Sequence, residues 1–188
     1  FFAVPKDAPE RLREGIYSGR YLQTGVGTVQ VILLDTRSFR SPLSYGESGG
    51  DCPRSRLIPN QDPTATILGQ EQWGWLEEQL QQPAVLRLIV SSIQVIPDQH
   101  CYEKWANFPR ERQRLMNLLA ETQEEQTVIL SGDRHLAEIS RMRPSPQAKP
   151  VYEVTSSGLN SAGAGLGEVN RHRVTPCRRA DPRSRFRE

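Results

Sequence analysis

LRLIVSSIQVI at residues 86–96, a helix-like segment at 109–122 and TVILS at 127–131 together decide the fold of this chain. The first and last of these segments are rich in Val, Ile and Leu, which is typical of strands that are buried on both faces. The middle segment places leucines at helical spacing and follows a potential capping residue, Asn107. A strand, a helix and a second strand in this order predict two parallel strands joined by a right-handed crossover. The expected class is therefore α/β.

Further regular segments are expected on both sides of this unit. Two apolar, β-branched runs predict strands, and two segments predict helices, of which one is ended by Pro83 and the other is short. A long, proline-rich connection lies between them, and such a connection in a compact domain is usually a functional loop or a disordered one. The strands are expected at 28–35 and 151–155, the helices at 69–82 and 7–13, and the connection at 36–67.

Composition limits the class of protein. The chain has 188 residues, a formal charge of +2 and 36% hydrophobic residues, which suits one globular domain. The near-balanced charge argues against a polybasic nucleic-acid binder, and no apolar run approaches the roughly 20 residues of a membrane span. Residues 171–188 contain seven arginines and two acidic residues, a net +5. We therefore expect a domain at 1–170 and a disordered tail, which is either a basic arm for an anionic partner or an aberrant end.

Several other chemistries have no support in the sequence. There is no G-x-S-x-G nucleophile motif and no glycine-rich loop ending in Lys-Ser or Lys-Thr. The glycine-rich residues 158–167 lack the spacing of a dinucleotide-binding loop and are expected to form a flexible loop. Cys52, Cys101 and Cys177 have no zinc-binding spacing. One disulfide is possible, but the cysteine count does not fix a redox compartment.

Polar residues follow three of the predicted strands, at the ends where open α/β sheets place their chemistry. The strongest signal is Ser131-Gly132-Asp133-Arg134-His135. If the backbone stays extended, Asp133 and His135 point to the same side and could bind one metal ion. Arg134 would then reach over a phosphate with its planar guanidinium group. The structural alternative makes Asp133 the cap of a turn and His135 an ordinary surface histidine.

Five further polar residues are candidates for binding substrate or for supporting the site. Asp35 and Arg37 follow the strand at 28–35, and they could either pair structurally or orient a site residue. Gln94 lies in an apolar run, so its side chain must find hydrogen-bond partners, in a pocket or on neighbouring backbone. Asn107 and Arg110 mark a helix start with a solvated face, or else the rim of a cleft.

Six segments occur in one order along the chain: VILLDTR (31–37), LGQEQWGWL (68–76), VSSIQV (90–95), WANFPRER (105–112), LSGDRH (130–135) and YEVTSSGL (152–159). Together they resemble the alkaline phosphatase D, or PhoD-like, metallophosphatases. Several motifs in one order make the resemblance specific.

The resemblance implies a metallo-dependent phosphatase fold, in which two mixed β-sheets pack face to face as a sandwich flanked by helices. It implies hydrolysis of phosphate mono- or diesters at a cluster of metal ions, with calcium and iron typical of the family. Asp133 and His135 fall at the positions of metal ligands, while Asp35 and Arg37 match a supportive motif. The expected partner is a small phosphate ester rather than a nucleic acid. Because family members are commonly exported, an extracytoplasmic location is implied.

The chain also departs from the family pattern. The earlier metal-binding strands, which include an Asp-Asp-His-Asp-type motif, lie upstream of the point that matches Phe1. The resemblance therefore implies a partial domain, the C-terminal part of such an enzyme, with most metal ligands elsewhere. The alternative function is a non-catalytic remnant or binding module. A third hypothesis, nucleic-acid binding through residues 171–188, predicts an affinity that falls steeply with salt.

Overall fold

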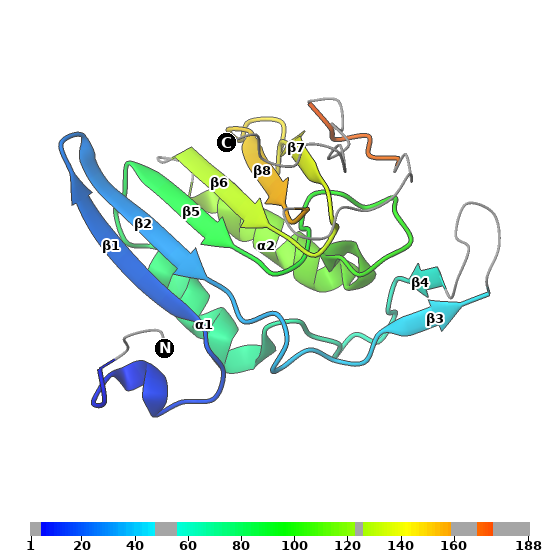
Figure 1. The fold of residues 1–188 in the computed structure, drawn as a ribbon, viewed down its shortest axis with the longest axis horizontal. Coiled ribbons are helices and arrows are strands. Elements are labelled where there is room, and N and C mark those ends of the chain that lie inside the picture. The colour runs from blue at the N-terminus through cyan, green and yellow to red at the C-terminus, as the bar shows by residue number, and fades with distance from the viewer. Residues whose placement is uncertain (1–4, 48–55, 123–125, 159–168, 175–188) are drawn as a thin grey trace, which may run out of the picture.

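The computed structural model describes residues 5–47, 56–122, 126–158 and 169–174. Within these residues, six strands form one mixed sheet in the order β1-β2-β5-β6-β8-β7 (Figure 1). The four central strands run parallel, and β1 and β7 are antiparallel edge strands. The strands are β1 (Ser18–Thr24), β2 (Gly27–Leu33), β5 (Leu86–Val90), β6 (Gln126–Ser131), β7 (Ala137–Met142) and β8 (Val151–Ser156).

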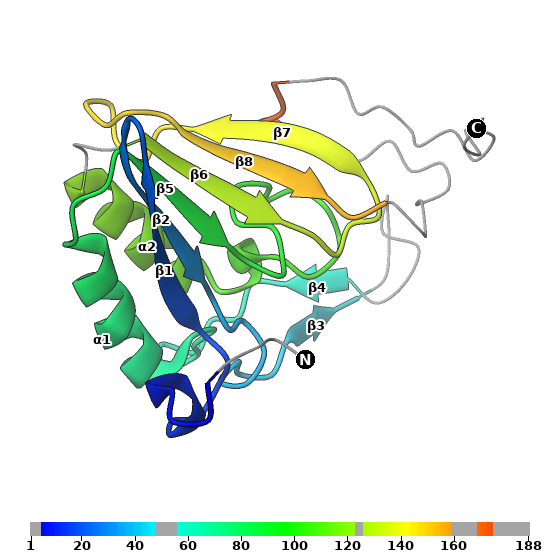
Figure 2. The same cartoon turned by 60° about the vertical axis from the view of Figure 1, so that its left-hand side comes forward.

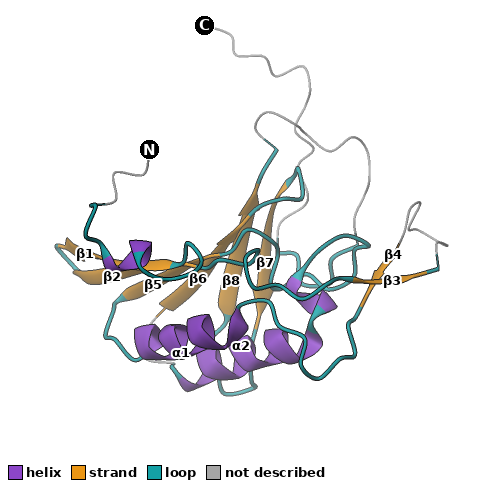
Figure 3. Cartoon of the chain, turned by 90° about the horizontal axis from the view of Figure 1, so that it is seen from below, coloured by secondary structure: helices purple, strands orange, loops and turns teal. Residues whose placement is uncertain are grey.

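Two helices cover one face of this sheet. Figure 3 shows α1 (Gly69–Leu80) and α2 (Pro109–Glu121) on the same side of the strands. The apolar faces of the helices pack against every second side chain of the strands. The resulting core consists of aliphatic and aromatic residues that are almost completely buried. Each such side chain contributes about 1.5–3 kcal/mol of burial energy. The sheet supplies Ile32, Ile89 and Ile129, and the helices supply Trp73, Leu76, Leu80, Leu115, Met116 and Leu119.

The opposite face of the sheet carries aliphatic residues as well, among them Val31, Leu88 and Val128, but these are only half-buried. The described residues place no helix on this face (Figure 3). A second, two-stranded sheet of β3 (Ser44–Gly46) and β4 (Arg56–Ile58) lies beyond the ends of the central strands (Figure 2). The α/β class is confirmed, with one mixed six-stranded sheet and helices packed against it. No helix among the described residues is both long enough and apolar enough to cross a bilayer.

The structure corrects two predicted elements. The strand expected at 86–96 ends at Val90, although Ile93, Val95 and Ile96 are fully buried, because an apolar run reports burial and not extension. The helix expected at 7–13 is only a 3-10 turn, η1 (Pro9–Arg11). The edge strands β1 and β7 and the short strands β3 and β4 were not predicted.

Part of the chain that sequence reasoning left irregular falls outside the described residues. This holds for residues 159–167 of the predicted flexible loop and for 175–188 of the predicted tail. The first residues of that tail lie alongside β7. The backbone N–H of Val174 donates to the carbonyl of Ile139, and Arg173 forms an isolated antiparallel β-bridge with Ser140.

Candidate functional site

The carboxyl ends of the four parallel strands meet at one edge, which Figure 2 shows as the edge to which the arrowheads of β2, β5, β6 and β8 point. Thr36, after β2, shares a short hydrogen bond with Ser92, after β5. A Cβ atom on Gly132 would lie 3.7 Å from both Ser92 and Ser157, so the β5, β6 and β8 ends are in contact. The backbone N–H of His135 donates to Ser157 Oγ at 2.9 Å. The strand ends thus form one continuous surface.

The β6–β7 loop presents Asp133 and His135 on this surface, and both side chains are exposed. The extended backbone on which the sequence argument relied is wrong: φ is +69° at Asp133 and +55° at His135. Left-handed backbone at a non-glycine residue costs on the order of 1 kcal/mol or more and gathers at functional sites. Gly132, which sequence reasoning expected to allow this turn, has no positive φ.

These two side chains offer one carboxylate oxygen and one imidazole nitrogen, which suits calcium and iron respectively. In the part of the chain that the structure describes, no group of three or more His, Cys, Asp or Glu residues gathers to hold an ion. Asp133 and His135 thus offer two donor groups of the right chemistry on this surface, and both are accessible from solvent.

Arg134 turns away from its neighbours and stacks on the loop that follows β5. Its guanidinium carbon lies 3.9 Å from the centroid of the Tyr102 ring. The backbone N–H of Tyr102 donates to His100 Nδ1 at 3.2 Å, and Lys104 Nζ donates to the Tyr102 carbonyl at 3.1 Å. His100 and Lys104 are buried. We call His100, Tyr102, Lys104 and Arg134 the basic cluster.

The charge state of His100 follows from this environment. Burial first, and then the positive charges of Lys104 and Arg134, lower the pKa of His100 to about 2. The imidazole is therefore neutral, and because Nδ1 accepts a hydrogen bond, the proton resides on Nε2. No acceptor for that Nε2–H lies among the described residues. Burial also lowers the pKa of Arg134, while Tyr102, Asp133 and Glu138 raise it.

A second group of polar side chains lies under the sheet between β7, β8 and the segment after β5. Gln94 Nε2 donates to Glu138 Oε1 at 2.7 Å and to Thr155 Oγ1 at 2.8 Å. Glu138 also accepts from Asn170 at 3.1 Å and from Arg173 Nε at 2.8 Å. The predicted site residue Gln94 is thus fully buried and holds the sheet and the β5 loop together.

Glu153 completes this group, which we call the acidic network: Gln94, Glu138, Glu153, Thr155, Asn170 and Arg173. Its carboxylate accepts the backbone N–H groups of Val95 and Ile96 at 2.9 and 2.6 Å. Burial raises the pKa of Glu153 to about 7, with a smaller contribution from the negative charge of Glu138, although its hydrogen bonds lower it. The network therefore fixes the segment that leads into the basic cluster.

Asp35 and Arg37 do not pair through their side chains. The Asp35 carboxylate accepts the backbone N–H groups of Ile16, Arg37 and Ser38 at 2.9–3.0 Å, so it caps the turn after β2. Burial alone would raise the pKa of Asp35, but hydrogen bonds, first from Ser38, outweigh it and lower that pKa. The Arg37 guanidinium instead binds both oxygens of Glu103, at 2.8 and 2.9 Å, within the loop of the basic cluster.

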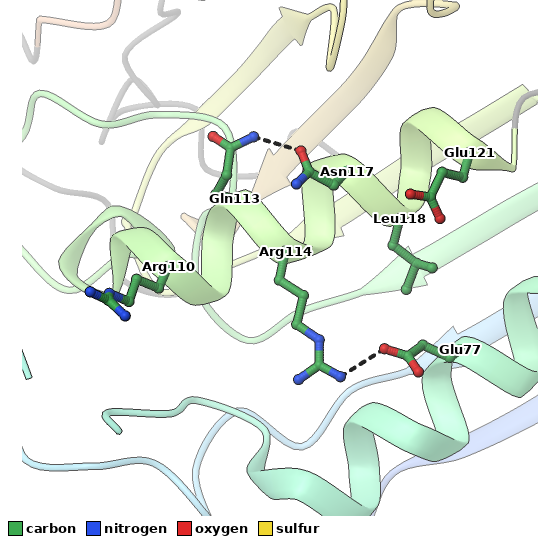
Figure 4. A pocket seen from close by; sticks show the side chains of 7 residues that line it. All are labelled: Glu77, Arg110, Gln113, Arg114, Asn117, Leu118 and Glu121. Atoms are coloured by element: carbon green, nitrogen blue, oxygen red, sulfur yellow. Dashed lines mark hydrogen bonds and ion pairs between the residues drawn. The ribbon is translucent and has the colours of Figure 1, made fainter. Parts of the chain in front are cut away.

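The remaining two predicted residues separate. Asn107 is buried beside the basic cluster, where its Oδ1 accepts the backbone N–H of Lys104 at 2.9 Å. Arg110 lines a polar groove of about 460 Å³ between α1 and α2, near the Glu77–Arg114 ion pair (Figure 4). Within the described residues, no hydrogen bond or ion pair links Arg110 to the other candidates. This groove lies between the two helices, away from the surface formed by the strand ends, so Arg110 is separated from the other candidates.

Sequence reasoning missed His100, Tyr102 and Lys104. The available signal was weak: several polar residues directly after the buried run that ends at Pro97. The structure also shows that Cys101, in the middle of this loop, is disulfide-bonded.

Comparison with known proteins places this arrangement among the phosphatases. The sequence pattern of the PhoD-like phosphatases matches residues 8–187, a range that includes most of the arginine-rich segment. The chain therefore belongs to the PhoD-like phosphatase family, a hydrolase family that is generally metal-dependent. Among solved structures, the structure of PhoD shares this fold with a TM-score of 0.62 and 22% sequence identity. That match covers 80% of this chain and 30% of the PhoD chain. No curated protein matches the chain.

Proposed function

We propose that this chain carries part of a metal-dependent site that hydrolyses small phosphate mono- or diesters. The observation that carries the proposal is the position of Asp133 and His135. Both are exposed, both have left-handed backbone, and both lie where four strand ends meet. Strained backbone with no role in packing is a feature of functional sites.

In this proposal Asp133 supplies an oxygen ligand and His135 a nitrogen ligand, with calcium and iron as the expected ions. Bound ions of this kind would supply polarisation of a phosphoryl oxygen and activation of a water molecule near neutral pH. Arg134 stabilises the negative charge that redistributes over the phosphoryl oxygens. Gln94, Asn107 and the Arg37–Glu103 ion pair hold the surrounding loops in place.

The test is hydrolysis of 4-nitrophenyl phosphate and bis(4-nitrophenyl) phosphate by the full-length protein, with calcium and iron supplied or chelated. Removing a hydrogen-bond partner of a metal ligand typically costs 10–100-fold, so removing the ligand itself by Asp133→Ala should lower turnover at least about a hundredfold. The matched control is Asp62→Ala, which removes an exposed carboxylate from a different loop.

Near-normal turnover of Asp133→Ala with metal still bound would reject the assignment. Metal-bound wild-type protein without turnover would instead support the non-catalytic remnant or binding module. We also propose an extracytoplasmic location, which the disulfide at Cys101 supports because structural disulfides persist in oxidising compartments.

A further inference from the structure

The basic cluster has features that packing does not explain. His100 is only 7% exposed, yet its Nε2–H has no acceptor among the described residues. Leaving a buried donor without a partner costs about 1–3 kcal/mol, so such groups are uncommon in folded proteins. Asn107, 1% exposed and joined to the cluster through the Lys104 backbone, also has an amide nitrogen without an acceptor in the described parts of the chain. One short stretch of chain thus holds two buried donors for which the described residues supply no acceptor.

The surroundings of these donors are positively charged. Lys104 and Arg134 both act electrostatically on His100. The nearby carboxylates have other contacts: Glu103 binds Arg37 and Arg40, and Glu138 lies in the acidic network. Asp133 is the neighbour of Arg134 in the chain and is exposed. Positive charge combined with N–H donors is the chemistry that recognises phosphate and similar oxyanions.

We propose that the basic cluster, with Asn107, is a subsite for a tetrahedral oxyanion beside the predicted metal ligands, in which Arg134 and His100 donate to a phosphate group. This inference rests on the proposed function for its substrate class, phosphate esters. Tyr102 is the positioning residue, because its ring carries the Arg134 guanidinium 3.9 Å from its centroid. Tyr102 is 39% exposed, and its ring lies 6.3 Å, centroid to centroid, from that of His100, so the stacked Arg134 and the buried imidazole flank one partly exposed side chain.

The test separates binding from catalysis. Full-length protein labelled with ¹⁵N is stripped of metal with a chelator, and inorganic phosphate is added while the His100 Nε2–H resonance and the heat of binding are followed. We expect saturable binding that shifts this resonance. A hydrogen bond to a charged group is worth enough that His100→Phe should weaken phosphate binding about tenfold or more.

Two further variants make the test specific. Tyr102→Ala should weaken phosphate binding and Tyr102→Phe should restore it, because only the ring is needed to carry Arg134. The control Arg114→Gln removes an arginine from the helical groove and should leave binding unchanged. Circular dichroism identifies any variant that fails to fold. If His100→Phe fails to fold, the comparison of Tyr102→Ala with Tyr102→Phe still decides the question. Absence of saturable binding, or equal binding by wild type and all folded variants, overturns the proposal.

Kinetics of the metal-loaded enzyme then identify which group binds. If the subsite holds the reacting phosphoryl group, His100→Phe raises KM for an aryl phosphate and for an aryl bisphosphate alike. If it holds a second phosphate of the substrate, only KM for the bisphosphate rises. An unchanged KM for both substrates contradicts the proposal. The phosphate-binding assay does not need turnover, so its result stands even if the proposed hydrolysis fails.

Discussion

The acidic network and the basic cluster each surround buried titratable side chains, Glu138 and Glu153 in the first and His100 in the second, and they differ in how those side chains are satisfied. In the acidic network, Glu138 and Glu153 accept hydrogen bonds from two segments, the one that follows β5 and residues 169–174. In the basic cluster, His100 Nε2 meets no acceptor among the described residues. The two carboxylates of the first group are thus satisfied by protein donors, although Gln94 Oε1 is not, whereas the imidazole Nε2–H of the second group lacks a partner in the part of the chain that the structure describes.

This difference distinguishes buried polar side chains that stabilise the fold from those that are available to bind a ligand. A buried network in which the acceptors are satisfied holds the fold, and its removal should reduce stability. A buried donor for which the described residues supply no acceptor costs stability, so its presence needs another reason. Burial also shifts one pKa in each group, in opposite directions: it raises the pKa of Glu153 and lowers that of His100.

The largest expected effect comes from breaking the acidic network. Glu138→Ala leaves the half-buried Arg173 guanidinium without its carboxylate, and removing one partner of a buried ion pair typically costs about 3–5 kcal/mol. Urea denaturation measures the loss. The matched control is Glu77→Ala, which breaks a half-exposed ion pair with Arg114 and should cost less than about 1 kcal/mol. Equal losses for the two variants would show that Glu138 is no more structural than a surface residue.

The next effect is a pH dependence with two opposite contributions. The folded pKa of Glu153, about 7, lies above its ordinary value of 4.5, so its contribution to stability is present below pH 4.5 and is lost as pH rises through 7. At about 1.4 kcal/mol per pH unit, the loss amounts to about 3 kcal/mol. His100 acts in the reverse direction, because its pKa is lowered from 6.5, and stability falls as pH decreases below 6.5.

Comparing variants with wild type isolates each group, since contributions from all other residues cancel. Between pH 8 and pH 5, Glu153→Gln should lose the gain of about 3 kcal/mol that wild type obtains from this residue. His100→Phe should not show the decrease in the free energy of unfolding that His100 causes in wild type, about 2 kcal/mol at pH 5. Urea denaturation at both pH values provides the measurement. Parallel pH profiles for wild type and both variants would contradict the burial argument.

The sequence was sufficient to predict the central strands and both long helices, because apolar runs and helical spacing report burial directly. The edge strand β1 was missed, since most of its residues are exposed and it carries no apolar run. β7 was missed for a related reason: its buried positions are Glu138 and Ser140, which polar partners satisfy. Both strands exist because of pairing with a neighbour, which no local pattern records.

The candidate site was predictable only in part. Asp133, Arg134 and His135 were predicted as site residues because they follow a buried strand, and that assignment stays a prediction. The left-handed backbone of Asp133 and His135 was not predicted, since nothing in the residue types requires it. The roles of His100 and Tyr102 depend on a stacking contact with Arg134, some 30 positions away in the sequence. Contacts of this kind follow from tertiary structure and leave no periodic signal.

The smallest expected effect concerns the basic cluster at neutral pH. His100→Phe keeps an aromatic ring, removes a donor that has no acceptor among the residues the structure describes, and removes the acceptor for the Tyr102 N–H. These contributions oppose each other, so the free energy of unfolding at pH 7.5 should change by less than about 1 kcal/mol. Saturating phosphate then sharpens the comparison. It should stabilise metal-free wild type by about 2.7 kcal/mol at a hundred times Kd, and the variant clearly less. A loss as large as that of Glu138→Ala, without phosphate, would instead make His100 a structural residue like those of the acidic network.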